Sequence, residues 1–348
     1  MDIVVSTPHQ ETTRKEIKEL LKKEAEIITE EYLLFSACLE EAAFFTYNAR
    51  SITSSMILLA KGRFSSKEDI INQELKIKPF LKERFAIRCK RKGEHDFSSK
   101  DIEEELGAKI KAKADLGNPE TLILVEIMHD QFLIGVDLAG FKLARRDYRV
   151  KTMPVSLHPC IAYAMLREAE WTAKKSLLDP WSKEGTLGIE AALYALSISP
   201  FLHEKKKFLF TYLIQLKEWD KRQEEKLNIT VMGEKFTYIK NVEVNAKLAG
   251  VNKHIQLSRQ SLEWLDARFK KKEIDCIVSF LQFARDEDPE KNIKELFHQA
   301  DYILKGRMVL LSDHPDLIEQ YAEHYKFTVK REALEMNGRT LFLFVCQK

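Results

Sequence analysis

The stretch LLDPWSKEGTLGIEAALYAL, residues 177–196, decides the fold of the second half of this chain. Its apolar beginning predicts a short buried strand that ends at Asp179 and Pro180. Residues 186–196 follow Gly185 and carry apolar side chains at helical spacing. A strand, a loop and a helix in this order are the repeating unit of a parallel sheet.

The same alternation of strands and helices continues to the end of the chain. Strands are predicted at 274–279, 308–311, 327–331 and 340–345, and helices at 160–172, 186–196, 290–303 and 315–325. Strands that alternate with helices indicate a mostly parallel, doubly wound α/β sheet. We therefore expect residues 151–348 to form one domain of this class.

The first half of the chain has shorter elements and a different order. Strands are predicted at 2–6, 32–38 and 56–59, with helices at 13–24 and 39–49, which indicates a small α+β layer over residues 1–64. A polar connector at 65–83 leads to a strand at 85–89, a helix at 101–110 and a hairpin over 121–137. We expect residues 65–150 to form a second domain.

Composition excludes several classes of protein. The formal charge is +2, so the chain is no highly basic nucleic-acid coat. Twelve glycines are about half the usual share of about 7%, which leaves few for glycine-rich loops. The five cysteines and nine histidines lack ligand spacing, so no metal is expected. A signal peptide and a long apolar run are missing from the sequence, which favours a cytoplasmic protein without membrane contact.

Several longer stretches resemble one family of RNA-modifying enzymes. FAIRCKRKGEHDFSSKDIEEELGAKI (85–110), DLGNPETLILVEI (115–127) and FLIGVDLAGFKLARRDYR (132–149) resemble the THUMP domain. SLHPCIAYAML (156–166), the stretch around Asp179, NAKLAGV (245–251) and FHQADYILKGRMVLLS (297–312) resemble the Rossmann-like domain of THUMP-containing tRNA guanine-N2 methyltransferases. The resemblance implies a ferredoxin-like layer before THUMP, S-adenosylmethionine as cofactor and tRNA as partner.

The cofactor motif departs from that family. The family has Asp-Pro-x-x-Gly-x-Gly-Thr, so the resemblance assigns cofactor binding to Asp179, Gly185 and Thr186. Lys183 stands where the first glycine of the motif allows close approach to a ligand, and we expect its side chain to enter the methionine pocket. The ribose-binding acid of the family would match Glu234, which the sequence places out of register, and its adenine-binding Asp falls at Ser261.

The catalytic motif departs as well. The family has Asn/Asp-Pro-Pro-Tyr/Phe, which accepts hydrogen bonds from the amine of the flipped base and stacks on that base. The matching residues here are Phe280, Leu281, Gln282 and Phe283. A phenylalanine offers no side-chain acceptor, and both prolines are missing, so only Phe283 keeps its stacking role.

Two basic stretches lie in the THUMP-like residues, and we assign them to RNA phosphates. The first holds five cations in nine residues without an acid, and the second holds five in ten with Asp147. The candidates are Arg84, Arg88, Lys90, Arg91 and Lys92, followed by Lys142, Arg145, Arg146, Arg149 and Lys151. The alternative for both stretches is a solvated charged face.

Three functions follow from these observations. The degraded motifs favour a tRNA-binding protein that has lost methyl transfer, with the methyltransferase-like domain as a second RNA surface or a platform for a protein partner. The alternative is an active S-adenosylmethionine-dependent tRNA guanine-N2 methyltransferase with an atypical site. A pure interaction protein without RNA is the third hypothesis, against which the two basic stretches argue.

Overall fold

A computed structural model describes residues 1–220, 222–336 and 338–348. The chain forms two compact units. The first consists of Met1–Leu143 with His203–Trp219, and the second of Ala144–Leu202 with Asp220–Lys348. The domain boundaries expected at 64/65 and 150/151 stay predictions.

The first unit is built on one eight-stranded sheet of order β2-β3-β1-β4-β8-β7-β5-β6. Its strands are β1 (Asp2–Ser6), β2 (Glu26–Ile27), β3 (Tyr32–Ser36), β4 (Ser54–Arg63), β5 (Arg84–Lys92), β6 (Lys113–Ala114), β7 (Thr121–Met128) and β8 (Gln131–Asp137). Its helices are α1 (Gln10–Leu21), α2 (Leu39–Asn48), α3 (Lys67–Ile71) and α4 (Ser99–Gly107), with 3₁₀ turns at Lys205–Lys207 and Leu209–Tyr212. The pairing of β4 with β8 joins the expected N-terminal layer and the THUMP-like residues in a single continuous sheet.

The second unit is built on a seven-stranded sheet of order β11-β10-β9-β12-β13-β15-β14. Its strands are β9 (Leu177–Asp179), β10 (Ile229–Gly233), β11 (Gln256–Arg259), β12 (Ile274–Leu281), β13 (Leu304–Ser312), β14 (Thr328–Met336) and β15 (Arg339–Gln347). Its helices are α5 (Pro159–Glu168), α6 (Thr186–Ala195), α7 (Phe236–Leu248), α8 (Leu265–Arg268), α9 (Pro289–Ile303) and α10 (Pro315–His324), with 3₁₀ turns at Asn252–His254 and Leu262–Trp264. The mixed α/β class and the Rossmann-like second domain expected from the sequence are confirmed.

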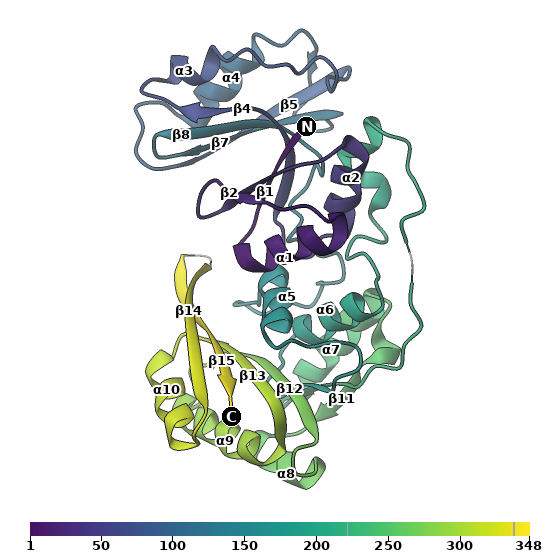
Figure 1. Ribbon diagram of the computed structural model, residues 1–348, viewed down its shortest axis with the longest axis vertical. Coiled ribbons are helices and arrows are strands. Elements are labelled where there is room, and N and C mark those ends of the chain that lie inside the picture. Colours follow the sequence, from purple (N-terminus) through teal and green to yellow (C-terminus); the bar gives the residue numbers. More distant parts are fainter. Residues whose placement is uncertain (221, 337) are drawn as a thin grey trace. The chain divides into compact units, whose positions relative to one another are not determined.

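Each central strand of this sheet sends alternate side chains into two separate cores. Leu177 and Val231 pack with α5, α6 and α7, whereas their neighbours Leu178 and Met232 pack with α8, α9 and α10. Figure 1 shows these two groups of helices on opposite faces of the sheet. Burial on both faces explains why the strands are continuous apolar runs in the sequence.

The strand order reverses at the centre of the second sheet. The chain runs outward from β9 through β10 to β11, and then returns to the other side of β9 as β12. In open α/β sheets a ligand binds outside the carboxyl ends of the strands at such a switch point. The loops that follow β9 and β12 are therefore the place to look for a site.

Two further features bear on the kind of protein. Within the residues that the structure describes, no helix has the length and apolar character needed to cross a lipid bilayer. The same residues contain no group of three or more His, Cys, Asp or Glu side chains placed to hold a metal ion.

Candidate functional site

Asp179 is the buried carboxylate of the site. It ends β9 and is 3% exposed. Ser279 on the adjacent strand β12 donates a hydrogen bond of 2.8 Å to Oδ1 of Asp179. Burial raises the pKa of Asp179 to about 6, although hydrogen bonds from Ser279, Ser182 and the Trp181 backbone oppose the rise. A carboxylate desolvated in this way gains from a bound cation.

The loop after β9 turns sharply into α6. The Ser182 N–H donates to the Met232 carbonyl at 2.8 Å, and the Gly185 N–H donates to Ser182 Oγ at 3.2 Å. Gly185 has φ = 82°, and a Cβ there would lie 2.5 Å from Val242, so a glycine is required. Gly185 is the N-cap of α6 and, because it lacks a side chain, it makes no capping hydrogen bond of its own. Uncapped N–H groups at a helix start suit an anion such as a carboxylate.

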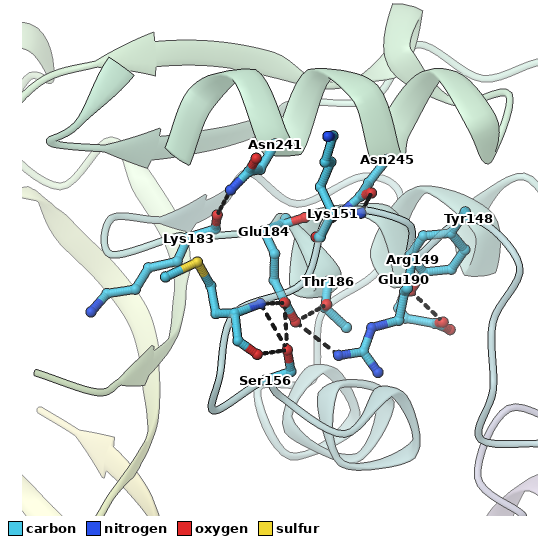
Figure 2. A network of polar contacts seen from close by, with 12 residues as sticks. Tyr148, Arg149, Lys151, Ser156, Lys183, Glu184, Thr186, Glu190, Asn241 and Asn245 are labelled. Atoms are coloured by element: carbon cyan, nitrogen blue, oxygen red, sulfur yellow. Dashed lines mark hydrogen bonds and ion pairs between the residues drawn. The ribbon is translucent and has the colours of Figure 1, made fainter. Parts of the chain in front are cut away.

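Glu184 ties this loop to the segment before α5 (Figure 2). Its carboxylate accepts hydrogen bonds from Arg149 Nη2 at 2.9 Å and from the Met153 N–H at 3.1 Å. Ser156 Oγ donates at 2.7 Å and Thr186 Oγ1 donates at 3.0 Å. We call these contacts the Glu184 network. They hold the loop against the segment before α5 and supply hydrogen-bond partners to the buried Glu184 carboxylate.

The Lys183 side chain points away from the Glu184 network and contacts the loop after β12. Figure 2 shows its side chain extending away from Glu184. Its Nζ donates to the Gln282 carbonyl at 2.7 Å and to Glu287 Oε2 at 3.2 Å. The side chain therefore connects the two loops of the switch point, and its ammonium group is held by the second loop.

The loop after β12 carries the four residues that match the catalytic motif. Phe280 and Leu281 still belong to β12, and Leu281 is 2% exposed. The Gln282 carbonyl accepts a second hydrogen bond from Trp181 Nε1 at 3.2 Å. The ring of Phe283 packs against Trp181 with centroids 5.5 Å apart. The partly buried Phe283 ring also packs against His314, and the Gln282 carbonyl is already engaged.

A hollow of about 360 Å³, including the open solvent at its mouth, lies between the two loops. It is lined by Met153, Val155, Leu157, Asp179, Trp181, Ser182, Lys183, Glu184, Gly185, Thr186, Leu187, Phe280 and Gln282. Asp179 suits an ammonium group, and the uncapped start of α6 suits a carboxylate. These two groups are the ends of a bound amino acid, so the chemistry of these residues suits the methionine part of S-adenosylmethionine.

A second hollow, of about 190 Å³ including the open solvent at its mouth, shares Trp181, Ser182 and Lys183 with the first. It is lined by Trp181, Ser182, Lys183, Gly233, Glu234 and Tyr238. Glu234 directly follows β10 and borders this hollow, so the expectation that it lies out of register is wrong. A carboxylate beside the end of the second strand suits ribose hydroxyls. The residues therefore fit S-adenosylmethionine at its ribose end as well.

The first basic stretch is largely paired with acids from distant segments. Arg84 lies 3.1 Å from Glu120, and Lys90 and Lys92 lie 3.7 Å and 3.0 Å from Glu31. The stretch has no acid in the sequence, but it has several in space. These ion pairs compete with phosphate for the same cations.

The second basic stretch divides into buried and exposed residues. The side chain of Arg146 is fully buried and lies 3.0 Å from Glu190, and Arg149 is held in the Glu184 network. Arg146 is therefore removed from the candidate RNA contacts, because phosphate cannot reach it. In the first basic stretch, the Arg91 guanidinium lies over the ring of Phe97. Among the described residues, the exposed candidates without a side-chain ion pair are Arg88, Lys142, Arg145 and Lys151.

The strand order, the buried acid at the switch point and the glycine-opened helix define a Rossmann-like methyltransferase class. The family described as "RMKL-like, methyltransferase domain" matches residues 146–340, and the THUMP domain matches residues 68–137. The first match spans more than half of the chain, so the chain belongs to the THUMP-containing RMKL-like methyltransferase family.

Two curated relatives are named tRNA (guanine(6)-N2)-methyltransferase. The one from Methanocaldococcus jannaschii is 27% identical over 337 residues, which cover 88% of each chain. The one from Archaeoglobus fulgidus is 31% identical over 257 residues, which cover 70% of this chain and 62% of the relative.

Two solved structures share the fold over nearly the whole chain. TrmN from Thermus thermophilus matches with a TM-score of 0.75 at 20% identity, covering 100% of this chain and 99% of TrmN. SMU.472, a putative methyltransferase complexed with S-adenosylhomocysteine, matches with a TM-score of 0.82 at 17% identity, covering 99% and 97%.

These comparisons correct one expectation from the sequence. The hypothesis that methyl transfer has been lost is wrong, because the relatives that match most of this chain are named as tRNA methyltransferases. The departures from the family motifs do not remove all the groups expected in the site. Glu234 still borders the second hollow, and the Lys183 ammonium group is held by the loop after β12. The alternative hypothesis, an atypical but active site, is the better supported one.

Sequence reasoning missed three residues of the site. Glu184 occupies a position of the motif at which the family accepts any residue, so the sequence did not indicate a role for it. Ser279 precedes the four-residue segment, and its partner Asp179 is 100 residues away. Glu287 lies in the acidic run Asp286–Asp288, which is itself typical of an exposed helix start.

Proposed function

We propose that this chain is an S-adenosylmethionine-dependent methyltransferase that modifies the exocyclic amine of a guanine in tRNA. The observation that carries the proposal is the buried Asp179 beside the uncapped start of α6 at the switch point of the sheet. Membership of the RMKL-like methyltransferase family supports the same chemistry. The names of the two relatives support tRNA and guanine as the substrate.

Each loop then has its own role. Asp179 binds the ammonium group of the cofactor, the N–H groups that open α6 bind its carboxylate, and Glu234 accepts from the ribose hydroxyls. S-adenosylmethionine supplies the methyl group when bound. The target base has to leave its stack to reach this hollow, and the family resemblance assigns the stacking on that base to Phe283.

The THUMP domain and the exposed cations supply the affinity for RNA. Arg88, Lys142, Arg145 and Lys151 have no carboxylate partner among the described residues, so they are available to phosphates. Such contacts position an RNA without reading its sequence. The choice of the target base therefore depends on the pocket.

The test is methyl transfer from radiolabelled S-adenosylmethionine to a tRNA transcript. The relatives' names point to guanosine 6, so the matched control is the same transcript with adenosine at position 6 and its partner changed to uridine. We expect label in N2-methylguanosine with the first transcript and background with the second. Background with both transcripts and with bulk tRNA would overturn the proposal.

A further inference from the structure

Glu287 is a buried carboxylate in the loop between β12 and α9 that keeps an unused acceptor. Its side chain is 8% exposed. Oε2 accepts hydrogen bonds from Lys183 Nζ at 3.2 Å and from the Ala284 N–H at 2.7 Å. Oε1 is buried and accepts no hydrogen bond from any residue that the structure describes. Buried polar atoms without a partner are rare enough to require an explanation.

The charge of Glu287 is compensated, but Oε1 keeps its lone pairs. Lys235 Nζ lies 3.7 Å from Oε1 and also 3.7 Å from Asp286 Oδ2, which is beyond hydrogen-bond distance for both. The Lys235 side chain is 43% exposed, so it has room to move aside. A donor from a ligand could take its place at Oε1 while Lys183 holds the other oxygen.

Glu287 contacts a residue that lines the hollow, although Glu287 is not itself one of the lining residues. Lys183 binds both the Glu287 carboxylate and the Gln282 carbonyl, and Lys183 and Gln282 line the hollow. Phe283, which follows Gln282 and packs against Trp181, is the residue to which the family resemblance assigns stacking on the base. The free acceptor therefore lies in the loop that directly follows Phe280 and Leu281, the two positions where the family resemblance expects acceptors for the base.

Guanine presents an N1–H donor directly beside its exocyclic amine. A carboxylate is an acceptor only, so it attracts N1–H and repels a base with a lone pair at that position. Adenine has such a lone pair at N1. We propose that Glu287 reads guanine by accepting its N1–H at Oε1, which turns the adjacent amine toward the hollow; this rests on the proposed function. Glu287 is thus a specificity-determining residue in place of the acceptors that Phe280 and Leu281 do not supply.

The test uses 2-aminopurine, which keeps the amine of guanine but has a lone pair at N1 instead of N1–H. Unaltered protein should methylate a tRNA with guanine at the target about 5- to 150-fold faster than one with 2-aminopurine, the range for one good polar contact to a base. Glu287→Gln should bring that ratio close to 1, because an amide can donate to the N1 lone pair. Asp286→Asn is the matched control, since Asp286 is 77% exposed and shares Lys235.

A binding measurement separates this inference from the function on which it rests. The affinities for the two tRNAs are compared without cofactor, and the preference for guanine should again vanish in Glu287→Gln and persist in Asp286→Asn. If Glu287→Gln does not fold, Glu287→Asp keeps the charge beside Lys183 but withdraws Oε1, and it should reduce the preference.

Each outcome has a defined meaning. A preference for guanine that is as large in Glu287→Gln or in Glu287→Asp as in the unaltered protein would overturn the inference, as would unaltered protein without any preference in both assays. Binding that discriminates in the predicted way without methyl transfer would overturn the proposed function alone.

Discussion

The loops after β9 and β12 meet at one switch point, but they differ in how many groups of the family motifs they contain. The β9 loop keeps a buried carboxylate and a glycine that opens a helix, and these groups act through charge and backbone. The end of β12 and its loop have Phe280, Leu281 and Gln282 where the family resemblance expects a side-chain acceptor and two prolines, and Lys183 from the other loop donates to the Gln282 carbonyl. Cofactor binding by backbone tolerates side-chain change better than recognition of a base by a fixed set of acceptors.

Removing the charge at the end of β9 should have the largest effect. Asp179→Asn keeps the shape and the bond to Ser279 but loses the partner of the cofactor ammonium. A hydrogen bond to a charged group contributes about 1.5–3 kcal/mol, so kcat/KM for the cofactor should fall about 10- to 150-fold. Asp316→Asn, an exposed acid on α10, is the control and should leave it unchanged. If Asp179→Asn were as active as the unaltered protein, the β9 loop would not bind the cofactor.

Cutting the connection between the two loops should cost stability. Lys183→Ala leaves the 8% exposed Glu287 carboxylate without its hydrogen-bonded cation, and the free energy of unfolding should fall by about 1–3 kcal/mol. Urea unfolding measures this, and Glu287→Gln in the same background should lose less than it does alone, because the pair is coupled. Lys240→Ala breaks an exposed pair with Glu243 and should leave the midpoint unchanged. Strictly additive losses would mean that the two loops are independent.

Acid should weaken binding of the cofactor to the β9 loop. The pKa of Asp179 is raised to about 6, and only the ionised carboxylate attracts an ammonium group. Affinity should therefore be constant above about pH 7 and fall up to tenfold per unit below about pH 6, because the proton and the ligand compete for the same carboxylate. Titrations from about pH 5 to about pH 8, which span that transition, measure it. An equally steep fall in Asp179→Asn would assign the dependence to another group.

The smallest effect concerns the cations of the two basic stretches. Changing Lys142, Arg145 and Lys151 to Gln should weaken tRNA binding and flatten its dependence on salt by about 0.9 log unit per lost phosphate contact. Changing Lys90 and Lys92, which pair with Glu31, should do less. Affinity at a series of salt concentrations measures both. The reverse order of effects would show that the intramolecular pairs open on RNA.

The sequence predicts the elements of this fold well because their causes are local. The expected strand ending at Asp179 and the helix from residue 186 match β9 and α6. A short continuous apolar run predicts a strand that is buried on both faces, and a 3.6-residue period of apolar side chains predicts a helix, each within a short window. The class of the second unit therefore follows from its apolar pattern alone.

The site could be predicted only in part because its contacts join distant segments. Lys183 and Glu287 are 104 residues apart, and Lys92 and Glu31 are 61 residues apart. The residues that neighbour Lys183 in the sequence do not determine where its ammonium group lies. The expectation that its side chain enters the methionine pocket could therefore not be checked from the sequence. The same holds for the packing of His203–Trp219 with the first unit, because contacts at this separation depend on the completed fold.

Whether the β9 loop binds a methyl donor is tested most directly by calorimetric titration of the unaltered protein with S-adenosylmethionine. The contacts of Asp179, the start of α6 and Glu234 predict one saturable site with a dissociation constant between about 1 μM and 1 mM, the usual range for an enzyme and its substrate. The heat should disappear in Asp179→Asn at the same concentrations. Absence of binding to the unaltered protein at several millimolar, roughly beyond that whole range, would contradict the proposed use of this loop.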